Sequence, residues 1–480
     1  MANDNNTSFS IQKKKVVFVK PSKTTPSSHT LSLSTIDNDL SLRVLYRTIY
    51  VYKSNNIFST TQDHHDRERK TDNKQTDPAS LIEKALSDVL VFYYPLAGMM
   101  KRQSDGKLQI NCNAIGVPFL VANADCQLSS LNYLDGIEVD VKTAQKFLFD
   151  FPSDPNEGEH PLVVQVTKFA CGGFTIGMEL SHSVCDGSGA AQFFQAMAEL
   201  ASGKSEPSIK PVWERQKLVA KAPPGPPKFI VDPASLATSP FLPTDDILHA
   251  CFNVNAESIK RLRMDLIKEC EGDHVHQTDQ GKFYLTTFEV LTAYVWRSRF
   301  RAMKLSPDAK TLISLAMNIR RHLNPPLPDG YYGNAFINAN AVLTGKDLNE
   351  KPLSETAKVI KECKKSSSTN EYIYTTLELV ARMRELNVML EGIALELTDC
   401  RQIGLIKDID FGWGGPVNLV LVPCDNVDLC LFWPPNNADP SMKGGVRVHV
   451  TLPRAAMPKF KEEMDALKVQ EDHNDNALGA

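Results

Sequence analysis

Apolar and polar positions follow a strand-like pattern in two stretches of the chain. Residues 173–180 alternate in part and carry β-branched and aromatic side chains, which predicts a half-buried strand. Residues 248–254 predict a second strand on the far side of a proline-rich stretch. Both are followed by segments with a different period, so the strands are expected to alternate with helices.

Apolar residues recur three and four positions apart in four other segments, which is the spacing of an amphipathic helix. These segments are residues 81–90, which follow the good N-cap and first-turn pair Asp77-Pro78, residues 190–201, residues 256–269, and a C-terminal stretch containing Phe460, Met464 and Leu467. Strands interleaved with helices in both halves predict an α/β protein with two large mixed sheets.

The proline distribution predicts where the chain crosses between domains. Nine prolines lie between Pro207 and Pro243, and this density excludes a continuous helix and favours a semi-rigid spacer. We therefore expect an N-terminal domain at 1–202, a crossover at 203–246 and a C-terminal domain at 247–480.

Composition narrows the classes of function. A chain of 480 residues with 42% hydrophobic content can bury more than one core. The 53 basic and 57 acidic residues leave a net charge of −4, so no global positive field attracts nucleic acid or an anionic membrane. No secretory signal, membrane-length apolar run or paired cysteine spacing is evident, which predicts a cytoplasmic protein with free thiols. A monomer is the default expectation.

The segment Ser181–Gly187 carries the most informative chemistry. His182 ends an apolar run, and Asp186 follows four residues later in a turn broken by Gly187 and Gly189. A strand-to-helix turn of this kind can hold an imidazole rigidly at a crevice, as a general base requires.

Three other interpretations of this segment stay open at this point. His182 could be a core histidine with Asp186 as the cap of the next helix. His182 and Asp186 could bind a metal, although no nearby residue supplies a third ligand. Cys185 could be a nucleophile, although no lysine or arginine adjoins it to lower its thiol pKa. We expect no metal site.

A second motif, more than two hundred residues downstream, consists of Asp410, Phe411, Gly412, Trp413 and Gly414. Together, His-x-x-x-Asp-Gly and Asp-Phe-Gly-Trp-Gly resemble the plant BAHD family of acyl-CoA-dependent acyltransferases. Residues 164–193 look closest to the branch with taxane acyltransferases and benzyl alcohol benzoyltransferases. Further segments agree with this family: Leu33–Asp37, Tyr93–Gly98, Thr287–Glu289 and Asn324–Asn334.

The resemblance implies two chloramphenicol-acetyltransferase-like domains, the first with His182 and the second with Asp410–Gly414, and a channel between them. It also implies that Asp186 supports the turn by pairing with an arginine, for which Arg297 and Arg320 are candidates. The 410–414 motif is then a structural loop on the coenzyme side of the channel, although a plain tight turn explains it equally well. Acyl-CoA is the implied cosubstrate, with no bound cofactor.

Acyl transfer from a thioester needs a base that deprotonates the acceptor and returns the proton to the leaving thiolate. We expect His182 to do this without a covalent acyl-enzyme, and the acceptor to be a hydroxyl, less readily an amine, of a specialised metabolite such as a terpenoid or aromatic alcohol. A noncatalytic binding protein and a thioester hydrolase remain alternatives.

Two basic groups could meet the coenzyme phosphates, and solvated helix faces explain them equally well. They are Lys260, Arg261 and Arg263, and Lys361, Lys364 and Lys365. No glycine-rich nucleotide motif is present.

Some segments depart from the family pattern or lie outside it. Met99 stands where an arginine is usual, and Ser181 where another histidine is frequent. A polar insertion at 54–74 contains His64-His65-Asp66, which could bind a metal but is better explained as a solvated loop. The tail from Lys468 onward is expected to be disordered.

Overall fold

A computed structural model describes residues 9–54, 77–136, 140–153, 157–272, 284–388, 394–423 and 426–468. Two compact units share these residues: unit 1 draws on Met1–Val219, Pro328–Asn334 and Ile403–Val422, and unit 2 on Ala220–Leu327, Ala335–Gln402 and Pro423–Ala480. The His64–Asp66 cluster and the tail beyond residue 468 lie outside the described residues.

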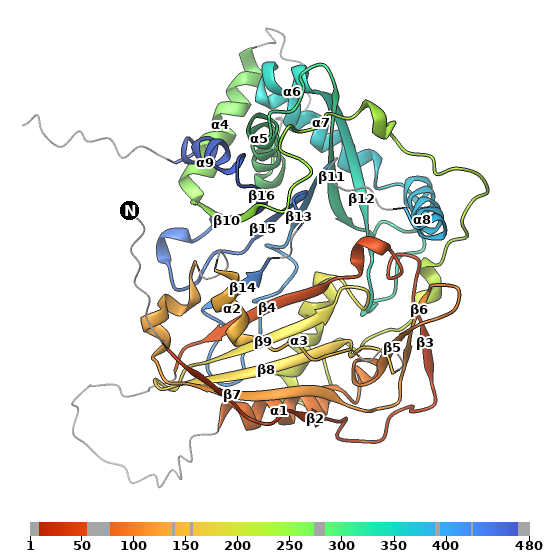
Figure 1. The fold of residues 1–480 in the computed structure, drawn as a ribbon, viewed down its shortest axis with the longest axis vertical. Helices are drawn as coiled ribbons and strands as arrows, with labels where there is room; N and C mark the ends of the chain where they lie inside the picture. The colour runs from red at the N-terminus through yellow and green to blue at the C-terminus, as the bar shows by residue number, and fades with distance from the viewer. Residues whose placement is uncertain are drawn as a thin grey trace, which may run out of the picture. The chain divides into compact units, whose positions relative to one another are not determined.

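Unit 1 is built on a seven-stranded sheet with the order β1-β7-β8-β9-β4-β14, to which β2 adds by pairing with β7 (Figure 1). Only the β7–β8 pair is parallel among the pairs of this sheet in the described residues. The strands are β1 (Ile11–Lys13), β2 (Val17–Val19), β4 (Leu45–Tyr52), β7 (Val117–Ala124), β8 (Leu162–Phe169), β9 (Phe174–Ser181) and β14 (Asn418–Val422). A second sheet has the order β3 (Thr30–Ser32), β6 (Leu108–Asn111), β5 (Met99–Arg102).

Helices cover both faces of the large sheet of unit 1. On one face α1 (Pro78–Val89) and α3 (Gly187–Ala201) pack against each other (Figure 1). On the other, α2 (Val141–Ala144) and the short 3₁₀ segments around it bury an apolar cluster that includes Ile49, Phe147 and Val420. Because β9 is a central strand and both faces of the sheet are covered, all eight of its residues are buried. The expected half-buried strand is therefore wrong on burial and right on position.

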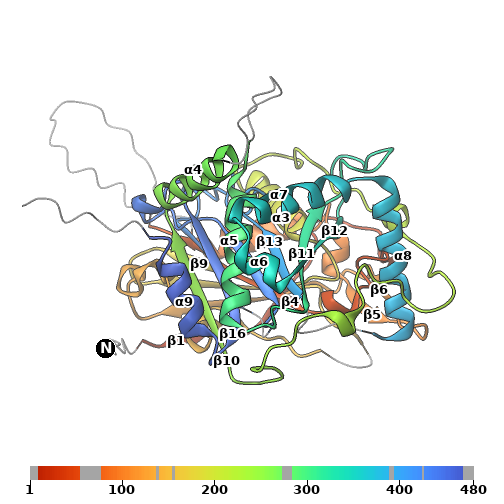
Figure 2. The same cartoon turned by 90° about the horizontal axis from the view of Figure 1, so that it is seen from above.

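Unit 2 has its own six-stranded mixed sheet with the order β10-β16-β15-β13-β11-β12. The strands are β10 (Ile247–Val254), β11 (Lys310–Asn318), β12 (Phe336–Thr344), β13 (Ala394–Asp399), β15 (Leu429–Trp433) and β16 (Val446–Pro453). The helices are α4 (Ala256–Gly272), α5 (Thr287–Ala302), α6 (Gly345–Glu350), α7 (Leu353–Ser366), α8 (Asn370–Leu386) and α9 (Met457–Asp465). Figure 2 shows α5 flanked by α9 and α6, and its Trp296 is fully buried in the core of this unit.

The sequence patterns located the elements well. The predicted helices at 81–90, 190–201 and 256–269 are α1, α3 and α4, the strand at 248–254 is β10, and the C-terminal amphipathic segment is α9. The proline-rich stretch 203–246, which is described throughout, holds only short 3₁₀ turns such as Arg215–Leu218 and Pro233–Ser235.

The compact units are not continuous stretches of chain. Pro328–Asn334 and Ile403–Val422 return to unit 1 from the second half of the sequence, and β14 becomes an edge strand beside β4. The motif at 410–414 therefore belongs to the same unit as His182. The boundaries 1–202, 203–246 and 247–480 stay a prediction about the domains of the chain.

Candidate active site

His182 lies in the tight turn between Ser181, the last residue of β9, and Gly187, the first residue of α3. Its backbone N–H donates to the carbonyl of Val44 at 2.9 Å, and Val184 N–H donates to Ser181 at 3.0 Å. Residues on both sides of His182 in this turn are buried, whereas His182 itself is partly exposed. This exposure disfavours the interpretation of His182 as a core histidine.

The turn ends in the helix cap that its sequence predicts. Asp186 Oδ1 accepts a hydrogen bond from the N–H of Gly189 at 3.0 Å, which satisfies a free donor at the start of α3. Glycine is required at 189 for space, since a β-carbon there would lie 2.7 Å from Cβ of Cys185. Asp186 thus contributes to the shape of the turn.

A buried ion pair between Asp37 and Arg215 supports the His182 turn. The carboxylate of Asp37 accepts from Nη1 of Arg215 at 2.5 Å and from the backbone N and Nδ2 of Asn334 at 3.0 and 2.8 Å. Arg215 and Asn334 then donate onward, through Nη2 to the Val184 carbonyl at 2.8 Å and through Nδ2 to the His182 carbonyl at 2.7 Å. The backbone on either side of Ser183 is therefore fixed by two donors that share one carboxylate.

The members of this network are removed from solvent. Asp37 and Asn334 are 0% exposed, and Arg215 is 1% exposed. Burial lowers the pKa of the Arg215 guanidinium, but Asp37, together with Tyr331 and Cys185, opposes this effect, and the pKa ends above its ordinary value. The Arg215 guanidinium therefore stays charged at any physiological pH.

Sequence reasoning missed this network in part. Asp37 and Asn334 lie in segments that supported the family resemblance, but neither received a role, and Arg215 was not singled out. An arginine in a proline-rich stretch gives no periodic signal, and its pairing with a residue 178 positions away is a tertiary contact.

The nucleophile interpretation of Cys185 is disfavoured by its surroundings. Burial raises the pKa of the Cys185 thiol to about 12, and its Sγ lies 3.4 Å from the hydroxyl of Tyr332. A thiol in this state carries almost no thiolate at neutral pH. The metal interpretation also gains no third ligand, because no group of three or more His, Cys, Asp or Glu side chains in the described residues is arranged to hold an ion.

The arginines proposed as partners of Asp186 lie in unit 2. Arg297 donates from Nε to the carbonyl of Leu348 at 2.7 Å and from Nη2 to that of Lys351 at 2.6 Å. These bonds tie α5 to α6 and to the residue that follows it. A pairing of Asp186 with Arg297 or Arg320 stays a prediction.

The motif at 410–414 forms a loop anchored on β4 and β9. Oδ1 of Asp410 accepts from the N–H of Gly412 at 2.7 Å, and Gly412 and Gly414 have positive φ of 96° and 76°. Phe411 is the buried aromatic residue of the motif, at 2% exposed, and contacts Tyr52 edge to face. Trp413 is partly exposed and instead contacts Phe174 of β9 edge to face at 5.1 Å.

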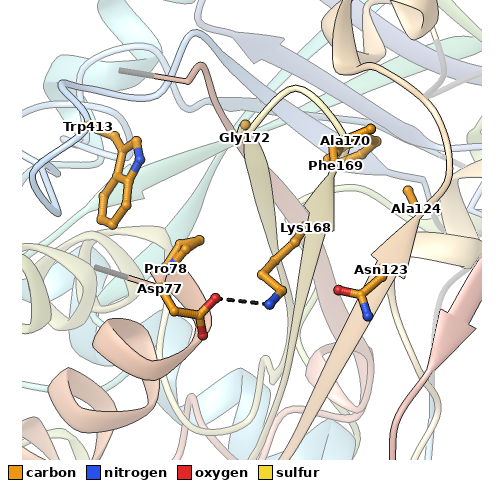
Figure 3. Close-up of a pocket in the computed structure, with 10 residues that line it drawn as sticks. Asp77, Pro78, Asn123, Ala124, Lys168, Phe169, Ala170, Gly172 and Trp413 are labelled. Atoms are coloured by element: carbon orange, nitrogen blue, oxygen red, sulfur yellow. Dashed lines mark hydrogen bonds and ion pairs between the residues drawn. The ribbon is translucent and has the colours of Figure 1, made fainter. Parts of the chain in front are cut away.

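Trp413 lines a cavity of about 400 Å³ in unit 1 (Figure 3). Figure 3 shows its indole at one side and Asn123 at the other, with Lys168 between them. The Lys168 ammonium pairs with Asp77 at 2.9 Å, and this carboxylate also caps α1. His182 does not line this cavity.

The basic residues considered for the coenzyme phosphates all lie in unit 2, and most of them have local partners. Arg261 donates to the Leu467 carbonyl at 2.7 Å, Arg263 to Thr287 Oγ1 at 2.6 Å, and Lys364 pairs with Glu289 at 2.7 Å. A contact between Arg261, Arg263 or Lys364 and the coenzyme phosphates stays a prediction. Lys260, Lys361 and Lys365 stay predictions of the same kind.

Comparisons with known proteins identify the class. The sequence profile of the Transferase family matches residues 9–467. The chain is 44% identical to a spermidine coumaroyl-CoA acyltransferase of Arabidopsis thaliana over 95% of this chain and 96% of that protein. It is 32% identical to a 3'-N-debenzoyl-2'-deoxytaxol N-benzoyltransferase of Taxus canadensis over 96% of this chain and 97% of that protein.

A solved structure agrees on the fold. Vinorine synthase superposes with a TM-score of 0.69 and 22% identity, covering 95% of this chain and 98% of that one. The chain belongs to the Transferase family, the BAHD acyltransferases, which use acyl-CoA as a cosubstrate. The predicted family, its taxane relatives and the two-sheet α/β fold are confirmed. In the described residues, no helix combines the length and apolarity needed to cross a membrane.

Proposed function

We propose that this protein transfers an acyl group from an acyl-CoA thioester to an amine nitrogen of an aliphatic polyamine such as spermidine, with His182 as the general base. The observation that carries the proposal is a partly exposed imidazole on a turn held by buried donors, in a chain 44% identical to a spermidine acyltransferase. The sequence alone favoured a hydroxyl acceptor. The amine is preferred here because both relatives above are named for nitrogen-bearing or N-acylated substrates.

The reaction needs one base and no covalent enzyme intermediate. A neutral amine attacks the thioester carbonyl, the C–N bond forms, and the nitrogen gives its proton to the imidazole of His182. The C–S bond then breaks, and the imidazolium returns the proton to the coenzyme A thiolate. Asp186 and the 410–414 loop keep supporting roles in this proposal, since one caps α3 and the other packs on β4 and β9.

The choice of acceptor is tested with the purified full-length protein and p-coumaroyl-CoA. Free thiol is followed with spermidine, with benzyl alcohol and with no acceptor, and the products are weighed by mass spectrometry. We expect thiol release that depends on spermidine, together with an amide product. Transfer to benzyl alcohol alone would restore the hydroxyl acceptor, and release without an acceptor would favour the thioester hydrolase.

Absence of thiol release with every donor and acceptor would favour the noncatalytic alternative, provided that the protein binds acyl-CoA. A cytoplasmic location and a monomeric state belong to the same proposal. They are checked by fractionation of plant tissue and by the mass of the purified protein in solution.

A further inference from the structure

Asp39 lies in a short segment of unit 1 that is fastened to the His182 turn on both sides. Before it, Asp37 binds Asn334, whose amide also donates to the carbonyl of His182 at 2.7 Å. After it, the carbonyl of Val44 accepts from the His182 N–H at 2.9 Å. Asp39 stands between these two attachments, and its carboxylate interacts electrostatically with the His182 imidazole.

Only one of the two carboxylate oxygens of Asp39 makes hydrogen bonds in the described residues. Its Oδ1 caps the 3₁₀ turn Leu40–Leu42 by accepting from the N and Oγ of Ser41 at 3.0 and 2.9 Å. Within the described part of the chain, Oδ2 has no hydrogen-bond partner and no cation lies within ion-pair distance of it. Arg43, exposed at the surface, and His182 are the charged or titratable groups that act on it.

This carboxylate lacks a counter-ion where one would stabilise it. Asp39 is partly buried, and burial raises its pKa above the ordinary value, with smaller opposing effects from Ser41, His182 and Arg43. A partly desolvated carboxylate whose second oxygen has no protein partner is stabilised when a cation or a donor approaches that oxygen. Groups in this state beside a catalytic side chain are candidates for ligand binding.

We propose that Asp39 binds a protonated nitrogen of the polyamine acceptor while a second nitrogen of the same molecule, in its neutral form, attacks the thioester beside His182. This inference rests on the proposed function and names the residue that selects its substrate class. A polyamine presents several amines on one flexible chain, and at neutral pH most are charged. A site for it therefore needs a base for one nitrogen and an anion for another, and the His182 turn and Asp39 supply both. An alcohol gains nothing from Asp39.

The variant Asp39→Asn separates the charge from the helix cap, because asparagine caps a helix about as well as aspartate. We expect KM for spermidine to rise by roughly tenfold to a hundredfold, the range for losing a hydrogen bond to a charged group. KM for p-coumaroyl-CoA, kcat and the thermal midpoint should stay within about twofold or a few degrees of the parent protein. A purely structural role would instead lower kcat or the thermal midpoint.

Asp439→Asn is the matched control. Asp439 caps the 3₁₀ turn Pro440–Met442 in unit 2 with the same pattern, accepting from the N and Oγ of Ser441 at 2.9 and 2.7 Å. Its substitution should leave KM for spermidine unchanged. Calorimetry with spermidine alone gives a second readout, in which binding to the parent protein weakens as the pH falls and Asp39 takes up a proton, while binding to Asp39→Asn is weak at every pH.

The outcomes separate this inference from the proposed function. If the parent protein does not acylate spermidine, the proposed function fails whatever Asp39 does. If the parent protein acylates spermidine and Asp39→Asn does so with unchanged KM and unchanged calorimetric affinity, the proposed function stands and the role of Asp39 is overturned.

Discussion

At the scale of single residues, one carboxylate organises the candidate active site. Asp37 neutralises Arg215 and orients Asn334, and these two side chains hold the carbonyls of Val184 and His182. Breaking a buried pair of this kind by removing one partner costs roughly 3–5 kcal/mol, because the other charge is left without compensation. The same network therefore stabilises unit 1 and fixes the backbone that carries the imidazole.

His182 itself should matter for chemistry and little for folding. We expect His182→Ala to reduce kcat by about 10²–10⁴, since general-base catalysis contributes this much, with an unchanged thermal midpoint. The side chain is partly exposed, and the backbone N–H and carbonyl of His182 make hydrogen bonds that hold the turn and that the substitution keeps. His322→Ala, at an exposed position of unit 2, is the control. Full turnover by a folded His182→Ala protein would remove His182 from the mechanism.

At the scale of elements, the strand that delivers His182 is buried on both faces, and it carries a charged residue. Glu179 of β9 is 3% exposed and pairs with Arg47 of β4, whose Nε lies 3.1 Å from Oε1. Burial raises the pKa of Glu179 to about 7, although Arg47 opposes this shift. The exposed Asp150, on the other side of Arg47 at 2.8 Å, adds to the rise.

This raised pKa predicts the sign of a pH effect on stability. Between the ordinary value of 4.5 and about 7, the folded protein keeps a proton that the unfolded chain loses, so the free energy of unfolding falls as the pH rises through this window. Glu179→Gln should reduce that fall by up to about 3 kcal/mol, measured by urea unfolding at pH 5 and pH 8. Glu257→Gln on the exposed side of α4 should leave it as it is. An identical pH dependence in Glu179→Gln would show that Glu179 ionises normally in the folded state.

At the scale of the whole molecule, unit 1 cannot be completed by the first half of the chain. Its large sheet needs β14 as the neighbour of β4, and its site needs Asn334, and both come from segments beyond residue 327. Unit 1 is therefore discontinuous in sequence, because segments from the second half of the chain complete it.

A fragment of residues 1–219 tests this point. It would expose the edge of β4 that β14 normally pairs with, and an unpaired strand edge promotes aggregation. We expect the fragment to be insoluble and inactive alone, and activity to return when it is co-expressed with 220–480. Solubility and tryptophan fluorescence during urea unfolding are the measurements. Cooperative unfolding of a soluble fragment 1–219 would contradict the need for the later segments.

Local patterns were sufficient for the elements and for the chemical motif. The 3.6-residue period of α1 and α3, the proline content of 203–246 and the glycines after Asp186 are properties of neighbouring residues, so they can be interpreted without a fold. The burial of β9 could not be predicted in this way, because a strand's own alternation does not reveal whether a second layer covers its outer face.

The residues that support His182 required the fold. Asp37, Arg215 and Asn334 are separated by more than a hundred residues from each other, and no local period connects them. The same holds for Asp39, because only folding partly desolvates its carboxylate and brings it within electrostatic range of His182. Sequence alone determined helices α1, α3, α4 and α9, strands β9 and β10, the acyltransferase family and the histidine motif, because these depend on short-range pattern. Burial, charge pairing and the neighbours of the imidazole depended on packing between distant segments, which only the folded chain defines.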